Sequence, residues 1–157
     1  MVSKYPLTVT KLNLPEYQFR IMELNGRLQI FDDLRKKFVA LTPEEWVRQN
    51  FLQYLIREKK YPQSLITVEG GLKLFRRSKR TDIVVFNNLG KPLLIVECKS
   101  PETTINQNVF DQVARYNMAL EVKYLVLTNG MNHFICSIDY VSQSYFFLRE
   151  IPEYSNL

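Results

Sequence analysis

One short run constrains the fold more than any other stretch, the four aliphatic residues 93–96 followed by Glu97, Cys98 and Lys99. Consecutive aliphatic residues are typical of a strand that is buried on both faces, as in a sheet with helices on each side. Glutamate and lysine side chains are almost never fully buried unless they are paired. The run therefore predicts a core strand that ends in charged groups, and these charges need a partner or a ligand.

The segments around this run predict a mixed α/β domain. Residues 81–86 and 92–99 flank a polar turn, which predicts an antiparallel hairpin. Apolar residues at helical spacing over 105–120 predict a helix, and the apolar segment 123–130 predicts a strand after it. A strand, a helix and a strand in this order form a crossover between parallel strands, so we expect a mixed central sheet flanked by helices.

The N-terminal half predicts a hairpin followed by a helix. Residues 28–41 hold two apolar runs around a polar turn, a pattern typical of a β-hairpin. Thr42 and Pro43 suit the N-cap and the first position of a helix, and Glu45 stands where a capping box places its acid. Two more strands are expected near the C-terminus, at residues 133–138 and 144–148.

Length and composition favour one domain over residues 1–157, because 46% hydrophobic content can bury one sizeable core. Neither a long apolar run nor a signal-peptide pattern occurs, so we expect a cytoplasmic protein without a membrane partner. Cys98 and Cys136 lie in apolar contexts and are interpreted as buried thiols. His133 is the one histidine, which excludes a histidine-based metal site or acid/base pair within one chain.

A basic run at residues 73–80 carries much of the net charge of +5. Such a run without acids suits contact with an anionic polymer such as a nucleic acid. The alternative is a solvated basic loop or hairpin edge. The predicted nucleic-acid contacts are Arg76, Arg77, Lys79 and Arg80.

The hairpin also predicts where the charged strand end finds its neighbours. Folding it about the middle of its turn gives three opposed pairs, namely Phe86 with Leu93, Val84 with Ile95, and Asp82 with Glu97. Strand alternation puts Lys99 on the same face as Glu97. Opposed residues of an antiparallel pair have Cβ atoms roughly 4.5 to 5.5 Å apart, and like charges there are destabilising.

Two carboxylates this close need a counter-charge, and two sources remain open. Lys99 could form a structural ion pair with them, since buried charges are normally paired. A divalent cation could bind instead, and hard oxygen ligands suit Mg²⁺ or Mn²⁺. With a metal bound, this arrangement would suit phosphodiester hydrolysis without histidine, and Lys99 would orient water or stabilise developing negative charge.

Four segments in order carry a family resemblance: TPEEWVRQNFLQYL, KRTDIVVF, LLIVECKSP, and DQVARYN followed by KYLVLTNG. They resemble the N-terminal nuclease domain of type I restriction enzyme R subunits, within the PD-(D/E)XK nuclease superfamily. The resemblance implies a restriction-endonuclease-like core over residues 38–148, with residues 1–37 as an N-terminal extension and hairpin. One departure is Thr81, which stands where the superfamily has proline before its first acid.

The resemblance also implies roles for single residues. Asp82 and Glu97 match the acids that bind Mg²⁺ or Mn²⁺, with the main-chain carbonyl of Cys98 as a further ligand, and Lys99 matches the catalytic lysine. The family often carries a glutamate on its first helix, and two compete here. Glu45 has a competing role in the capping box, whereas Glu44 precedes Val47, Phe51 and Leu55 at helical spacing, so we favour Glu44 on their inward face.

Gln112 and Tyr116 are four residues apart and therefore neighbours on one face of the predicted second helix. By themselves they are interpreted as a boundary glutamine and a core tyrosine. The helix directly follows the charged strand, so they could instead line the end of the sheet and hold a phosphate or a water. The resemblance implies this second role, because they match the family's Q-x-x-x-Y motif.

Type I R subunits continue into a motor, but no G-x-x-x-x-G-K-[ST] phosphate loop occurs here, so we expect neither a motor domain nor an ATP site in this chain. The leading hypothesis is a Mg²⁺-dependent endonuclease domain acting on DNA, with protein partners of a restriction or defence system. The alternatives are a noncatalytic nucleic-acid-binding or assembly module of the same fold, or a purely structural ion pair at a cleft that binds something else.

Overall fold

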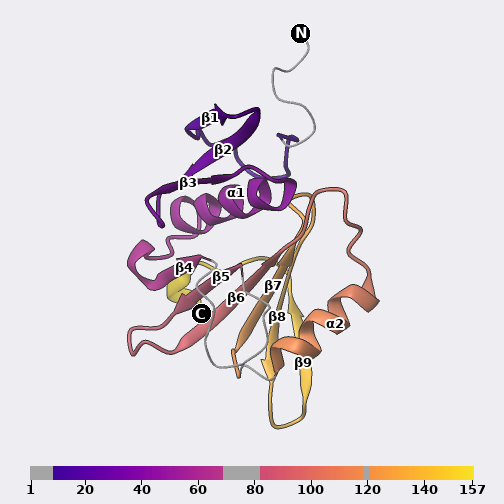
Figure 1. The fold of residues 1–157 in the computed structure, drawn as a ribbon. Helices are drawn as coiled ribbons and strands as arrows, with labels where there is room; N and C mark the ends of the chain where they lie inside the picture. Colours follow the sequence, from indigo (N-terminus) through magenta and orange to yellow (C-terminus); the bar gives the residue numbers. More distant parts are fainter. Residues whose placement is uncertain (1–8, 69–81, 119–120) are drawn as a thin grey trace.

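The computed structural model describes residues 9–68, 82–118 and 121–157 (Figure 1). Residues 69–81 and 119–120 lie outside the description, as do the side chains of Tyr116 and Asn117. The predictions for Arg76, Arg77, Lys79 and Arg80 fall in this part of the chain and stay predictions.

A six-stranded sheet, in the order β4-β5-β6-β7-β8-β9, forms the centre of the domain (Figure 1). Its one parallel pair in the described chain is β6 with β7, joined through the helix α2, and its other neighbours are antiparallel. The predicted mixed sheet and crossover are therefore confirmed. The strands are β4 (Ile66–Val68), β5 (Ile83–Phe86), β6 (Pro92–Cys98), β7 (Tyr124–Thr128), β8 (His133–Asp139) and β9 (Ser144–Leu148).

The β5–β6 hairpin has the predicted register over most of its length. Val84 pairs with Ile95, as expected from the symmetry of the turn. Phe86 pairs with Pro92 rather than with Leu93, so that prediction is wrong. The cause is a register shift between Val85 and Phe86 close to the turn, which does not propagate toward the charged end of the strands.

A second sheet of three antiparallel strands precedes the first helix. It consists of β1 (Ile21–Leu24), β2 (Arg27–Asp32) and β3 (Lys37–Ala40), so the predicted hairpin at residues 28–41 is present as β2 and β3. The additional strand β1 was not predicted. Its signal was the pair Asn25 and Gly26, both with positive φ, which forms a two-residue hairpin turn.

Helix α1 (Pro43–Arg57) lies between the two sheets (Figure 1). The predicted N-cap is confirmed, because the Thr42 hydroxyl accepts a 3.1 Å hydrogen bond from the Glu45 amide and Pro43 is the first helical residue. Val47 and Phe51 are fully buried against residues of β5 and β6. The chain also contains two single-turn 3-10 helices, Gln63–Leu65 and Tyr154–Asn156.

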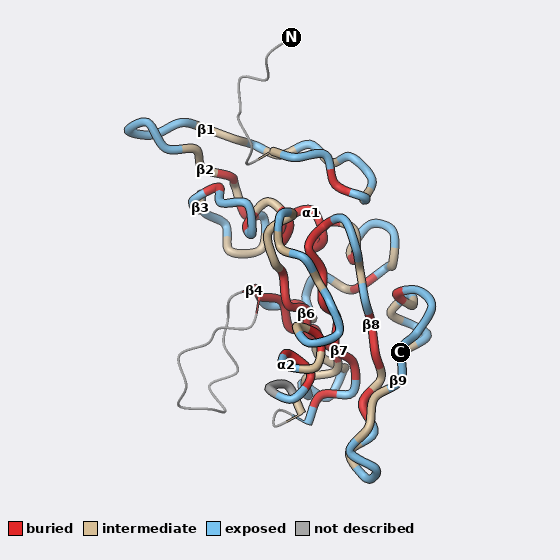
Figure 2. The backbone as a smooth tube through the Cα atoms, turned by 90° about the vertical axis from the view of Figure 1, so that its right-hand side faces the viewer, coloured by how far each residue is buried: buried red, intermediate tan, exposed pale blue. Residues whose placement is uncertain are grey.

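Helix α2 (Gln107–Met118) covers the opposite face of the sheet. Phe110, Val113 and Ala114 pack there against Val84 and Ile95. The central strands are consequently buried on both faces, as Figure 2 shows for β6 and β7.

The two cysteines and the histidine lie in surroundings that suit structural roles. Cys98 and Cys136 are free and buried, which confirms their interpretation as buried thiols. The ring of His133 bonds the Thr128 hydroxyl and the main-chain carbonyl of Asn13, and burial lowers the pKa of the imidazole. Within the described ranges, the helices are too short and too polar to cross a membrane.

Candidate active site

The two predicted acids lie at the same end of neighbouring strands. Asp82 directly precedes β5, and Glu97 is the penultimate residue of β6. Ile83 pairs with Val96, and each acid is the next residue beyond this pair at the same end of the hairpin. Both are almost fully buried, with 9% and 3% of their surface exposed. The strand ends therefore hold two carboxylates where charges are costly unless compensated.

The carboxylate of Asp82 is held by two donors. Its Oδ2 accepts a 2.7 Å hydrogen bond from the Cys98 amide, and its Oδ1 accepts one of 2.5 Å from Nη2 of Arg48 on α1. The first contact ties Asp82 to the end of β6, and the second supplies a positive charge. The sequence left Lys99 and a divalent cation open as sources of counter-charge, and the structure places a third group, the Arg48 guanidinium, beside Asp82.

Glu97 lies on the α2 side of the sheet. Ile95, two residues earlier on the same face of β6, and Leu127, its partner on β7, both belong to the core under α2. Lys99 follows β6, and its amide donates to the Thr128 carbonyl at 2.8 Å, which extends the ladder with β7 by one residue. Lys99 is half-buried, whereas the last five residues of β6 before it are buried.

Of the two glutamates at the start of α1, Glu45 is buried and Glu44 is not, the reverse of the expected arrangement. Glu44 is exposed and does not share the buried face of Val47, so that prediction is wrong. Successive residues of a helix point in directions about 100° apart, and in this first turn it is Glu45 that faces the protein interior. Glu45 is buried, and its carboxylate contacts Arg35, Arg48 and Gln49 rather than the Thr42 amide, which bonds Ala40.

The pKa of the Cys98 thiol is affected by several charged groups near the ends of β5 and β6. Burial raises its pKa well above the ordinary value, the carboxylates of Asp82, Glu97 and Glu44 raise it further, and Arg48 opposes them. Three acids from different elements thus act electrostatically on one buried point. Glu44 remains within electrostatic reach of the strand ends despite its exposure.

On α2, Gln112 is exposed rather than packed at a boundary. With Asn108 and Arg115 it lines an open cavity of about 420 Å³. The backbone of Tyr116 belongs to α2, but its side chain is outside the described part of the structure, so its predicted role stays a prediction.

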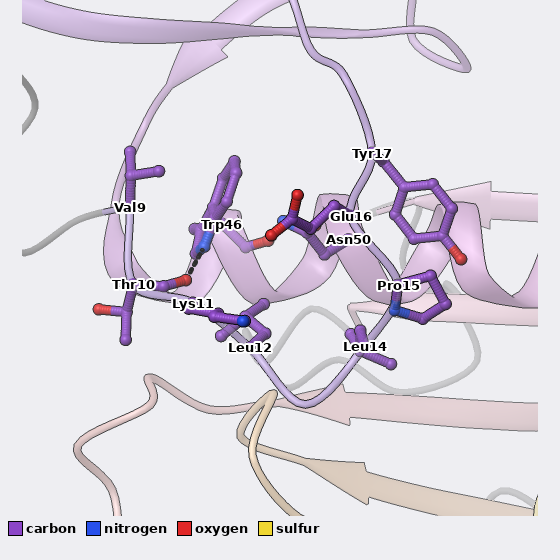
Figure 3. Close-up of a pocket in the computed structure, with 10 residues that line it drawn as sticks. All are labelled: Val9, Thr10, Lys11, Leu12, Leu14, Pro15, Glu16, Tyr17, Trp46 and Asn50. Carbon is purple, nitrogen blue, oxygen red and sulfur yellow. Dashed lines mark hydrogen bonds between the residues drawn. The ribbon is translucent and has the colours of Figure 1, made fainter.

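A separate cavity of about 290 Å³ lies between the N-terminal segment and α1 (Figure 3). Figure 3 shows the Trp46 indole directed at the Thr10 carbonyl, to which it donates a 2.8 Å hydrogen bond. The lining consists of residues from the segment 9–17 together with Trp46 and Asn50. None of the predicted site residues is among them.

The donor chemistry at the strand ends fits a hard divalent cation. Buried carboxylate oxygens are the ligands that Mg²⁺ and Mn²⁺ prefer. In the described ranges, no three histidine, cysteine, aspartate or glutamate side chains are grouped to hold a metal. The predicted ligand set has two side chains, Asp82 and Glu97, with the Cys98 carbonyl as the third oxygen.

Fold and site together define a mixed α/β domain with buried acids at the ends of two adjacent central strands. The family model for the type I restriction enzyme R protein N terminus matches residues 43–152. The match includes both helices and all six strands of the central sheet. The chain belongs to this family.

Among solved structures, the chain is similar to a fragment of a candidate HsdR subunit of a type I restriction enzyme from Vibrio vulnificus YJ016. The two share 23% sequence identity with a TM-score of 0.47, over 69% of this chain. The chain spans only 23% of the length of that structure. No curated protein matches the sequence.

Proposed function

We propose that this domain is a metal-dependent nuclease of the PD-(D/E)XK superfamily that hydrolyses phosphodiester bonds of DNA. The observation that carries the proposal is the pair of buried acids Asp82 and Glu97 at the ends of adjacent strands, with Lys99 two residues beyond the second acid. Family membership supports a place in a restriction system, with DNA and the other proteins of that system as partners.

In this proposal, Asp82, Glu97 and the Cys98 carbonyl hold Mg²⁺ or Mn²⁺. When bound, the metal would lower the pKa of a water molecule and neutralise charge on the phosphate. The Cys98 amide fixes the direction of the Asp82 carboxylate through its 2.7 Å hydrogen bond. Lys99, half-exposed after β6, orients the water or stabilises negative charge developing on the phosphate.

The polar face of α2 supports a role in substrate contact. Gln112 and Arg115 are exposed and line the same open cavity, so an amide and a cation face solvent together. A cationic side chain beside an amide donor suits a phosphate oxygen. The basic residues Arg76, Arg77, Lys79 and Arg80, which lie outside the described part of the structure, are proposed as further contacts with the DNA backbone.

The test compares Asp82→Ala with Lys99→Ala on supercoiled, linear and single-stranded DNA and on RNA, with Mg²⁺, Mn²⁺ or EDTA. We expect Asp82→Ala to lose both metal binding and cleavage, because it removes a ligand. Lys99→Ala should still bind metal and DNA but lose turnover. Lys91→Ala, an exposed lysine at the opposite end of β6, is the matched control and should cleave like the parent.

Failure of the parent to cleave any substrate, together with a melting temperature indifferent to Mg²⁺ and Mn²⁺, would contradict the nuclease proposal. DNA binding without cleavage would identify the noncatalytic nucleic-acid-binding module instead.

A further inference from the structure

A continuous chain of ionic contacts, half-buried at Arg35 and buried from Glu45 onward, leads from the three-stranded sheet to the candidate active site. At the end of β2, Asp32 Oδ2 accepts from Arg35 Nε at 2.6 Å, and Arg35 Nη2 donates to Glu45 Oε1 at 2.7 Å. Glu45 Oε2 contacts Arg48 Nη1, and Arg48 Nη2 reaches Asp82 at 2.5 Å. The chain crosses α1 and ends on an acid that the proposed metal would use.

Burial strengthens the electrostatic interactions along this chain of ionic contacts. The side chains of Arg48 and Glu45 are each 7% exposed, and that of Asp82 is 12% exposed. Charges in such surroundings are poorly screened by solvent and salt. A positive charge at Arg48 therefore acts strongly on whatever binds to Asp82.

The two arms of the Arg48 guanidinium have different partners. Nη1 faces Glu45 on its own helix, and Nη2 faces Asp82 at the start of β5. The planar fork thus places its charge next to Asp82, and Glu45 holds it there. Asp82 also keeps its hydrogen bond from the Cys98 amide, which does not depend on Arg48.

We propose that Arg48 is a positioning residue that acts as the internal counter-cation of Asp82 and thereby weakens the site's affinity for its divalent metal. The inference rests on the proposed metal-dependent function and adds a residue that controls how tightly the site binds its metal. Without metal, the guanidinium compensates the buried carboxylate. With metal bound at Asp82, two positive centres share one carboxylate and repel each other across a poorly screened distance.

The sign of the effect follows from the two contacts of Asp82. Removing Arg48 abolishes the repulsion, while the Cys98 amide still directs the carboxylate. Neutral variants should therefore bind metal more tightly, by about tenfold or more, because unit charges a few ångströms apart interact strongly at the effective dielectric of protein sites. An arginine with a purely structural role would change stability and leave metal affinity alone.

The experiment measures Mn²⁺ binding to the metal-free full chain by calorimetric titration, with Mn²⁺ alone as the probe. The variants are Arg48→Met, Arg48→Lys and the double variant Glu45→Gln/Arg48→Met. The double variant removes one charge of each sign and keeps the test open if Arg48→Met alone does not fold. Thermal melts without metal establish folding of every variant.

We expect Arg48→Met and the double variant to bind Mn²⁺ about tenfold or more tightly than the parent. Arg48→Lys retains the charge and should stay within about threefold of the parent, which separates charge from shape. Parent binding with unchanged or weaker affinity in both neutral variants would overturn the role of Arg48 and leave the nuclease proposal standing. If neither the parent nor the neutral variants bind Mn²⁺, both proposals fall.

Discussion

The two helices bury very different surfaces although they cover the two faces of one sheet. Helix α2 buries the apolar residues Phe110, Val113 and Ala114, while Gln112 on its other side faces solvent. Helix α1 buries apolar residues together with a polar set, namely Glu45, Arg48, Gln49, Asn50 and Gln53. Position in the fold explains the difference, because α1 lies between two sheets and α2 has one sheet below it (Figure 1).

A helix covered on two sides must satisfy its polar groups within the protein. On α1 this is achieved by contacts among Asp32, Arg35, Glu45, Arg48 and Gln49. Helix α1 therefore depends on charge pairing for its stability, whereas α2 depends on apolar packing and leaves its polar face available for ligands.

The largest expected effect comes from breaking the ionic chain at Glu45, its central acid. Glu45→Ala would leave the buried guanidinium group of Arg48 and the half-buried one of Arg35 with less compensation, and we expect a loss of about 3 kcal/mol in the free energy of unfolding. Urea denaturation measures it. Glu44→Ala, on the exposed neighbouring residue, is the control and should change stability by no more than about 0.5 kcal/mol. Equal losses in the two variants would refute the contrast.

A smaller effect is expected on α2, where packing dominates. Val113→Ala should cost about 2 kcal/mol, because it removes buried methyl groups next to Phe110 and leaves a cavity. The adjacent Gln112→Ala should change stability by no more than about 0.5 kcal/mol, since the side chain is exposed. It should reduce DNA cleavage, because Gln112 is a proposed substrate contact. Parallel urea denaturation and cleavage assays measure both, and a Gln112→Ala variant that loses stability like Val113→Ala would contradict the division of α2 into two faces.

The smallest expected effect is a dependence of stability on pH from Asp32. Burial alone would raise the pKa of this carboxyl, but hydrogen bonds from Arg35 and Gln49 bring it below the ordinary value of 3.8. A lowered pKa in the folded state contributes stability that is complete above the ordinary value and is lost as pH falls through the folded value. The stability difference between the parent and Asp32→Asn should therefore shrink on acidification from neutral pH.

Urea denaturation of the parent and of Asp32→Asn at a series of pH values measures this dependence. Asp33→Asn is the matched control, since Asp33 is the exposed neighbour and the substitution removes the same charge. A constant difference between the parent and Asp32→Asn down to strongly acidic pH would show that the carboxyl does not contribute in this way.

Most of the central sheet could be predicted because its signals are local. Alternation, the turn after Phe86 and helical spacing after Ile105 led to the β5–β6 hairpin and to the β6–α2–β7 crossover. The shift that pairs Phe86 with Pro92 could not be predicted, because a bulge near a turn changes the register without changing the apolar pattern.

The candidate site could be predicted only in part. The positions of Asp82 and Glu97 followed from hairpin symmetry, and both are buried at adjacent strand ends. Arg48 was missed although a signal was present, since it stands next to core position Val47 and three residues after Glu45. A charge at the edge of a buried helix face requires a partner, and the sequence does not show which one.

Local sequence patterns were sufficient to predict the β2–β3 and β5–β6 hairpins, the crossover through α2, the apolar faces that form the two cores, and the acids that end the central strands. These features depend on periodicity and on residues close together in the chain. Two features do not follow from those patterns: Arg48 pairs with Asp82, 34 residues away, and Glu45 rather than Glu44 is buried. Ion pairing depends on distance in space, and the burial of α1 between two sheets determines which charges come into contact.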